Sequence, residues 1–278
     1  IDNKIIKKTQ PSMEKINTLL DHFQNGRYEQ AKFLAELFTR DFPEHSFGWQ
    51  VLGGVLKETG YVEEAIDAFK KSLLINPQDA ISHSNLGIAL KDLGEFEEAE
   101  KTLRNAILLN YNYAPAHNNL ASTLKELGKH KEAEKSLRRA ISLKPDFEEA
   151  YTNLGKILNE MSRPNEAEEY LRKGIALKPL NPEIYNYLGI TLKELRKFEE
   201  SENIFKKAIL LKPDYAQSHH NLGNTLQEMG KLDEAASSYQ FSIKLKYENA
   251  ESHNNLGTVL KALGKLEEAE ESLKRAIN

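Results

Sequence analysis

Residues 80–113 read AISHSNLGIALKDLGEFEEAEKTLRNAILLNYNY, and this pattern recurs along the chain at intervals of 34 residues. The pair Leu86-Gly87 falls, one period at a time, on Leu52-Gly53, Leu120-Ala121, Leu154-Gly155, Leu188-Gly189, Leu222-Gly223 and Leu256-Gly257. A fixed period of this length indicates stacked copies of one supersecondary unit. We number the positions of each unit from its first residue. After a leader of residues 1–11, the units are 12–45, 46–79, 80–113, 114–147, 148–181, 182–215, 216–249 and a truncated 250–278.

Glycine and proline support this register independently, because they are the strongest breakers of regular structure. Of the 15 glycines, 12 fall at position 8 or position 15 of a unit. Five of the nine prolines fall at position 32, and these are Pro43, Pro77, Pro145, Pro179 and Pro213. The repeat is therefore a property of the whole chain from residue 12 onward.

Each unit is predicted to form two helices. In unit 80–113, Leu86, Leu90 and Leu93 share one face of a first helix, since they lie at i, i+4 and i+7. Gly94 supplies the left-handed conformation that ends this helix. An apolar face at Phe96, Ala99, Leu103 and Ala106 then marks a second helix. Small residues at positions 8 and 20 should let the two helices approach closely.

The second helices carry glutamates four residues before basic residues, an order that favours ion pairs on a helix surface. The pairs are Glu100 with Arg104, Glu134 with Arg138, Glu168 with Arg172, Glu202 with Lys206 and Glu270 with Lys274. We interpret them as the solvated outer face of the molecule.

This register resembles the tetratricopeptide repeat family. The resemblance covers residues 12–278 and rests on Trp49, Leu52, Gly53, Gly60, Ala65, Phe69 and Pro77. Unit 12–45 is the weakest match, with Gly26, Tyr28, Ala31 and Pro43 only. Ser162 and Arg196 replace the glycine at position 15, so we expect those two turns to close differently. Pro164 suits the first turn of its helix.

The resemblance implies an all-α fold, a right-handed α-solenoid of about eight helix pairs. The first helices would line a concave groove, and the second helices would form the convex outside. Because each unit contacts only its neighbours, we expect a single superhelix without an internal domain boundary over 12–278.

Position 6 of the first helix holds a column of asparagines: Asn85, Asn119, Asn153, Asn221 and Asn255. At about 100° per residue this position lies opposite the buried arc of the helix, and by resemblance it faces the groove. An amide both donates and accepts, so a column of amides could hold the backbone of an extended peptide. The tetratricopeptide arms of O-linked N-acetylglucosamine transferases carry a similar asparagine column, and this chain resembles bacterial relatives of those arms. The alternative is that asparagine is inherited family consensus with no ligand.

Two further features accompany the column. Tyr187 interrupts it, near Tyr151 and Tyr185, and is either an aromatic anchor for a peptide or a residue that has drifted. Position 12 holds a column of lysines at the rim of the groove: Lys57, Lys91, Lys125, Lys193 and Lys261. The residue after each lysine is mostly acidic, which favours a solvated mixed face over a binding site.

Composition excludes several functional classes. The chain has 40% hydrophobic and 29% charged residues, a net charge of −4 and no cysteine. It therefore lacks the basic face of a nucleic-acid binder and any thiolate metal site or nucleophile, and we expect no membrane association. His83, His117, His219 and His253 share position 4 of separate units, too far apart for one metal ion. We expect neither a cofactor nor catalysis by this chain, and a bacterial, cytoplasmic setting.

Two functions remain open from the sequence. One is a non-catalytic scaffold that binds a protein segment or peptide in its groove. The other is the substrate-recruiting arm of a larger transferase, of the O-linked N-acetylglucosamine type or a sulfo- or methyltransferase, continuing beyond Asn278. The last helix carries Leu266, Ala269, Leu273 and Ala276 with nothing after it to cover them. We accordingly expect weak self-association through this end.

Overall fold

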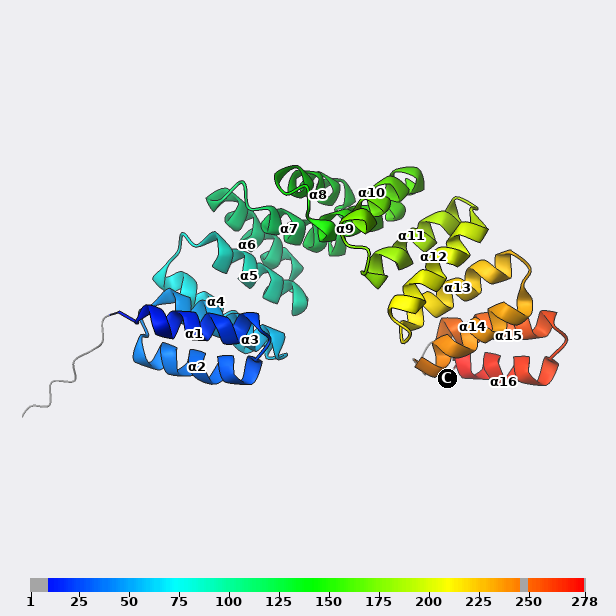
Figure 1. The fold of residues 1–278 in the computed structure, drawn as a ribbon, viewed down its shortest axis with the longest axis horizontal. Helices are drawn as coiled ribbons and strands as arrows, with labels where there is room; N and C mark the ends of the chain where they lie inside the picture. The colour runs from blue at the N-terminus through cyan, green and yellow to red at the C-terminus, as the bar shows by residue number, and fades with distance from the viewer. Residues whose placement is uncertain (1–9, 246–249, 278) are drawn as a thin grey trace, which may run out of the picture. The chain divides into compact units, whose positions relative to one another are not determined.

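The computed structural model describes residues 10–245 and 250–277, and it contains sixteen helices and no strand over these residues (Figure 1). The chain divides into two compact parts, residues 1–143 and 144–278. These are called the first and second unit below, and each 34-residue segment is called a repeat. The first unit holds α1 (Met13–Gln24), α2 (Tyr28–Asp41), α3 (Ser46–Glu58), α4 (Val62–Ile75), α5 (Ala80–Asp92), α6 (Phe96–Leu109), α7 (Ala114–Glu126) and α8 (His130–Leu143). The second holds α9 (Glu148–Glu160), α10 (Pro164–Leu177), α11 (Pro182–Glu194), α12 (Phe198–Leu211), α13 (Ala216–Glu228), α14 (Leu232–Leu245), α15 (Ala250–Ala262) and α16 (Leu266–Ile277).

The helices pair as the 34-residue register predicts. Within each unit, the two helices of one repeat pack together, and the second helix also packs against the first helix of the next repeat. The prediction of an all-α repeat solenoid is therefore confirmed. Even residues 12–45 form a helix pair, in which Leu19 is buried at the position that holds glycine or alanine in the other repeats.

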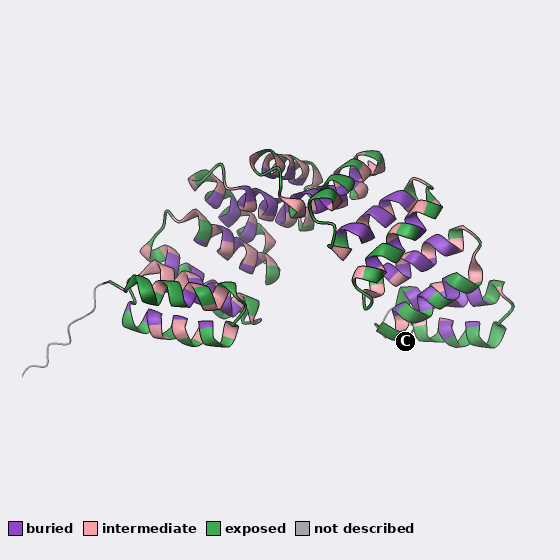
Figure 2. Cartoon of the chain, viewed as in Figure 1, coloured by how far each residue is buried: buried purple, intermediate pink, exposed green. Residues whose placement is uncertain are grey.

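Position 8 is small because the second helix occupies the space that a side chain would need. A Cβ atom added to Gly87 would lie 2.5 Å from the Cγ atom of Leu103, on the second helix of the same repeat. Both Leu103 and Ala99 are fully buried. The buried residues lie where the paired helices face each other, as the purple bands in Figure 2 show for each unit. Leu93 differs from the prediction: it caps α5 rather than extending its apolar face, and 40% of it is exposed.

The turn between the two helices has one geometry in all eight repeats, which corrects the expectation for Ser162 and Arg196. Gly94 has φ of +88°, and Ser162 and Arg196 have φ of +56° and +58°. In each case the N–H of the following residue donates to the carbonyl five residues earlier, as Arg163 N–H does to Leu158 at 2.8 Å. The hydrogen bonds thus hold Ser162 and Arg196 in the left-handed region, where a side chain costs about 1–2 kcal/mol.

The turn between repeats is fastened by the side chain at position 4. It bonds to the backbone carbonyl six residues earlier, at position 32 of the preceding repeat. The pairs are Trp49 with Pro43 (2.8 Å), His83 with Pro77 (3.0 Å), His117 with Tyr111 (3.0 Å), Tyr151 with Pro145 (3.1 Å), Tyr185 with Pro179 (3.0 Å) and His219 with Pro213 (3.0 Å). Since a carbonyl only accepts, each of these histidines donates from Nε2–H. His83, His117 and His219 therefore have a structural role.

The predicted ion pairs of the second helices form, and the structure extends their role. Arg104 reaches Glu100 at 2.7 Å, but Glu100 also accepts from Lys129 of the next repeat at 2.7 Å, and its side chain is only 14% exposed. Glu202 is held in the same way by Lys206 (2.6 Å) and Lys231 (2.8 Å). These hydrogen bonds keep the pKa of Glu202 below its ordinary value. The Glu100 and Glu202 carboxylates are therefore largely buried between adjacent repeats, and only their basic partners are well exposed.

Candidate peptide-binding surface

The predicted asparagine column lies on the first helices of both units. Asn85 and Asn119 belong to α5 and α7 of the first unit, and Asn153, Asn221 and Asn255 belong to α9, α13 and α15 of the second. All five are partly buried, between the core side of the helix and solvent. The structure thus places the column at an accessible position without leaving it fully exposed.

Three of these amides donate to the preceding repeat. Asn119 Nδ2 lies 3.2 Å from Ser84 Oγ, Asn221 Nδ2 lies 3.1 Å from Asn186 Oδ1, and Asn255 Nδ2 lies 3.1 Å from Asn224 Oδ1. Sequence reasoning missed these contacts. The available signal was the polar residue at position 5 (Ser84, Asn186). Position 5 of one first helix lies within hydrogen-bond distance of position 6 on the first helix of the next repeat. The column therefore contributes to stacking between repeats.

The amides nevertheless retain capacity for a ligand. A side-chain amide carries two N–H donors and a carbonyl acceptor. In Asn119 and Asn221 one N–H is used, while the second N–H and Oδ1 have no protein partner among residues 10–245 and 250–277. Donor and acceptor on one side chain match the N–H and C=O groups of an extended peptide.

Tyr187 occupies position 6 in α11, and charged groups surround it. The ammonium of Lys156 stands 4.6 Å from the centre of the Tyr187 ring and 3.4 Å from a carboxylate oxygen of Glu183. Burial alone would lower the pKa of Lys156, but Tyr187 and Glu183 outweigh it and raise that pKa. Tyr215 lies nearby, and its burial, with Tyr187 and Glu183, raises its pKa to about 12. One face of the Tyr187 ring is therefore covered by Lys156 and is not open to a ligand.

Tyr151 and Tyr185 have a different role from Tyr187. Both are buried, and their hydroxyls fasten the turns at Pro145 and Pro179. They cannot extend an aromatic surface around Tyr187.

The lysine column is balanced by neighbouring acids, as the sequence suggested. Lys57 contacts Glu58 at 2.7 Å, Lys91 contacts Asp92 at 3.5 Å and Lys125 contacts Glu126 at 2.9 Å. Lys193 lies beside Glu194, where burial raises the pKa of the carboxyl and Lys193 opposes that rise. These lysines are partly buried within a mixed surface.

A buried polar network in α13 and α15 was not foreseen from the sequence. His220 is buried, with Nδ1 2.6 Å from Ser252 Oγ and Nε2 3.0 Å from Asn224 Nδ2. Asn224 Oδ1 in turn accepts from Tyr239 at 2.7 Å. Burial lowers the pKa of His220, although Glu251 at 3.3 Å opposes this. Asn224 thereby links the Asn255 amide to the core of the second unit.

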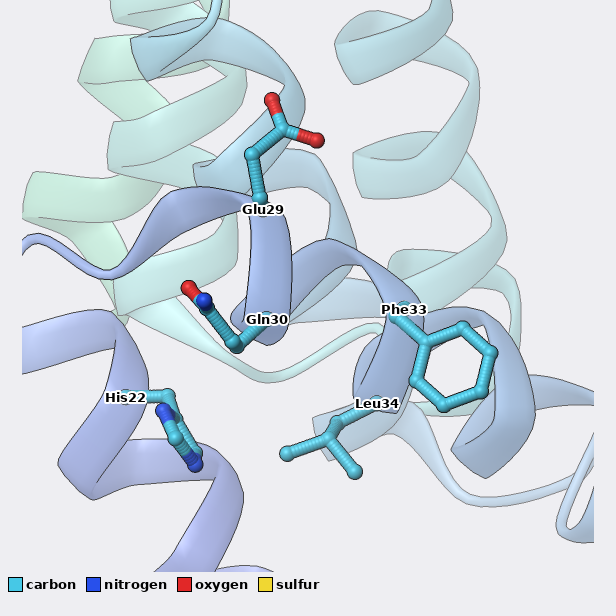
Figure 3. A pocket seen from close by; sticks show the side chains of 5 residues that line it. All are labelled: His22, Glu29, Gln30, Phe33 and Leu34. Carbon is cyan, nitrogen blue, oxygen red and sulfur yellow. The ribbon is translucent and has the colours of Figure 1, made fainter.

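A shallow depression between α1 and α2 has no arrangement suited to chemistry. Figure 3 shows His22 on α1 facing Gln30 and Leu34 of α2, while the Glu29 carboxylate points away from the imidazole. Phe33 is largely exposed at its edge. In the part of the chain that the structure describes, no three His, Asp or Glu side chains come close enough to hold a metal ion. No described helix is long and apolar enough to cross a membrane.

Family models match most of the chain. Models described as tetratricopeptide repeat match residues 78–146 and 214–278, 124–189, and 48–79 and 182–215, so that together they cover 48–278 without a gap. The chain belongs to the tetratricopeptide repeat family. The matches begin after residues 12–45, the repeat in which the tetratricopeptide pattern is weakest. A comparison with curated proteins found no match.

Solved tetratricopeptide structures share the fold. The Cut9–Hcn1 hetero-tetramer of the APC/C superposes with a TM-score of 0.70 at 19% identity, covering 100% of this chain and 57% of that chain. PilF of Pseudomonas aeruginosa gives 0.65 at 23% identity, covering 72% and 91%. YrrB, a TPR protein with an unusual peptide-binding site, gives a TM-score of 0.54 at 21% identity, covering 67% of this chain and 96% of that chain. At these identities the likeness concerns the fold alone.

Proposed function

We propose that this tetratricopeptide chain is a protein-interaction scaffold whose first-helix surface binds an extended peptide. The observation that carries the proposal is that Asn119 and Asn221, partly buried at the same repeat position, each keep one N–H and the Oδ1 atom without a protein partner among the described residues. Repeats of this family are typically non-catalytic. The peptide-binding site of YrrB, which shares this fold, supports a peptide as the partner.

The experiment must separate binding from folding, because Asn119 also holds Ser84. A phage library of random linear peptides is selected against the whole chain, and the affinity of the enriched peptides is measured by fluorescence anisotropy. Asn85→Ala with Asn119→Ala should weaken binding about tenfold, since each lost amide bond contributes about 0.5–1.5 kcal/mol.

Ser84→Ala is the matched control, because it removes the internal acceptor of Asn119 and leaves the amide in place. It should lower the midpoint of thermal unfolding as the asparagine variant does, yet preserve peptide affinity. Failure to enrich any peptide, or equal affinity for the wild type and the asparagine double variant, would remove the column from the proposed site.

The transferase-arm alternative, the cytoplasmic and bacterial setting and weak self-association stay predictions from the sequence. Sedimentation equilibrium at increasing concentration tests the last of these directly, and a strictly monomeric profile would contradict it.

A further inference from the structure

A groove lies between the second helices α6 and α8 of the first unit, separate from the asparagine surface. Its volume is about 700 Å³, and His117 and Leu120 of α7 line its floor. Leu108 and Tyr111 stand at its edge, 83% and 62% exposed. This accessible apolar edge offers a place for an apolar side chain.

Two cations in this groove have no carboxylate partner among the described residues. The Arg139 guanidinium lies 4.5 Å from the Tyr111 ring centre and donates to Asn112 at 3.1 Å, while its Nε is buried without a partner. Lys135 lies one helical turn earlier on α8, where like charges four residues apart repel. The Glu132 carboxylate at the rim is engaged by Arg104 at 2.7 Å.

The equivalent groove in the second unit shows that this arrangement is not a general feature of the repeat. Between α14 and α16 the corresponding arginine is Arg275, and Glu271 occupies the position of Lys135. Arg275 donates to Glu271 at 2.6 Å. Lys244 stands where the first unit has Leu108, and the volume is about 330 Å³. Of the two grooves, only the first combines an exposed apolar edge with two cations that have no carboxylate partner among the described residues.

We propose that the groove between α6 and α8 binds an acidic peptide segment with an apolar anchor. The anchor packs on Leu108 and Tyr111, and carboxylates of the segment pair with Lys135 and Arg139. Arginine stacked on an aromatic ring keeps its outer N–H groups oriented for a carboxylate, so little order is lost on binding. Charge complementarity then selects acidic over basic segments. The site does not depend on the asparagine column and can fail or succeed independently of it.

The probe is a fluorescein-labelled peptide with a central Leu-Phe pair flanked by glutamates, titrated with the whole chain. Two comparison peptides carry lysines in place of the glutamates, or serines in place of the Leu-Phe pair. The key variant is Lys135→Glu, which gives Arg139 the partner that Arg275 already has. Because Lys135 is exposed, the variant should fold, and circular dichroism checks this. Lys207→Glu on α12 is the control of equal charge change.

The wild type and Lys207→Glu should bind the acidic peptide, and Lys135→Glu should weaken its affinity at least tenfold. Both comparison peptides should bind at least tenfold more weakly than the acidic peptide. Equal loss in the two variants would show a general charge effect and overturn the proposal, as would absence of binding to the wild type. Self-association that Lys135→Glu abolishes, without peptide binding, would assign the groove to a second copy of the chain and also overturn it.

Discussion

Replacing Ser162 by glycine should stabilise the protein, because Ser162 is held at φ of +56° where its repeat needs a left-handed residue. The left-handed conformation costs an L-residue about 1–2 kcal/mol. Glycine removes this cost but gives the unfolded chain more freedom, which offsets about 0.4–1 kcal/mol. The net gain for Ser162→Gly is therefore about 0.5–1 kcal/mol.

Arg196 offers an internal comparison at the same repeat position, with φ of +58°. Its guanidinium lies 5.5 Å from the Phe198 ring centre. Arg196→Gly loses this exposed cation–π contact, which contributes about 0.5–1 kcal/mol. The gain from relieving the backbone is then nearly cancelled, and we expect a change close to zero.

Urea unfolding followed by circular dichroism measures both variants, with the slope checked for constancy. Lys207→Gly, inside the exposed face of α12, is the control and should destabilise by about 1 kcal/mol, as glycine does in a helix interior. If Ser162→Gly destabilises as much as Lys207→Gly does, the turn at Ser162 is not strained and the reasoning is refuted.

Three other changes test the packing. Gly87→Leu should destabilise the protein by roughly 1–3 kcal/mol through overlap with Leu103. Urea unfolding measures this, and the added Leu103→Ala substitution should recover part of the loss. A double variant no more stable than Gly87→Leu alone would contradict the overlap. Tyr185→Phe removes only a hydroxyl and should cost about 0.5–1.5 kcal/mol in thermal unfolding; an unchanged midpoint would mean water replaces that bond fully. Glu202→Gln should reduce the loss of stability in acid: the lowered pKa gives a contribution that is present above the unfolded pKa and is lost as pH falls through the folded value. Urea midpoints across pH 7 to about 2 measure this, with exposed Glu199→Gln as control, and an unchanged acid profile for Glu202→Gln would contradict it.

The sequence predicted the repeat, the helix pairs and the close contact at Gly87, because those depend on periodicity and on residue size. It predicted the ion pair of Glu202 with Lys206 within one helix, but not the bond to Lys231 from the next repeat. Periodicity tells which face a residue lies on, and it does not tell which atoms of a long side chain meet across two repeats.

The same limit applies to the candidate site. The accessible position of Asn119 followed from helical geometry, whereas its bond to Ser84 depends on the spacing between helices of adjacent repeats. For Ser162 the sequence suggested a different turn, since serine rarely adopts positive φ. The backbone hydrogen bonds of the turn override that local preference.

The most direct test of peptide binding by the first-helix surface is a titration of the ¹⁵N-labelled chain with a selected peptide, observing the side-chain amide resonances of asparagine. The account predicts that the Asn119 or Asn221 resonances shift in step with binding, because their second N–H and Oδ1 meet the peptide backbone. Saturable binding that leaves both amides unshifted would contradict the account.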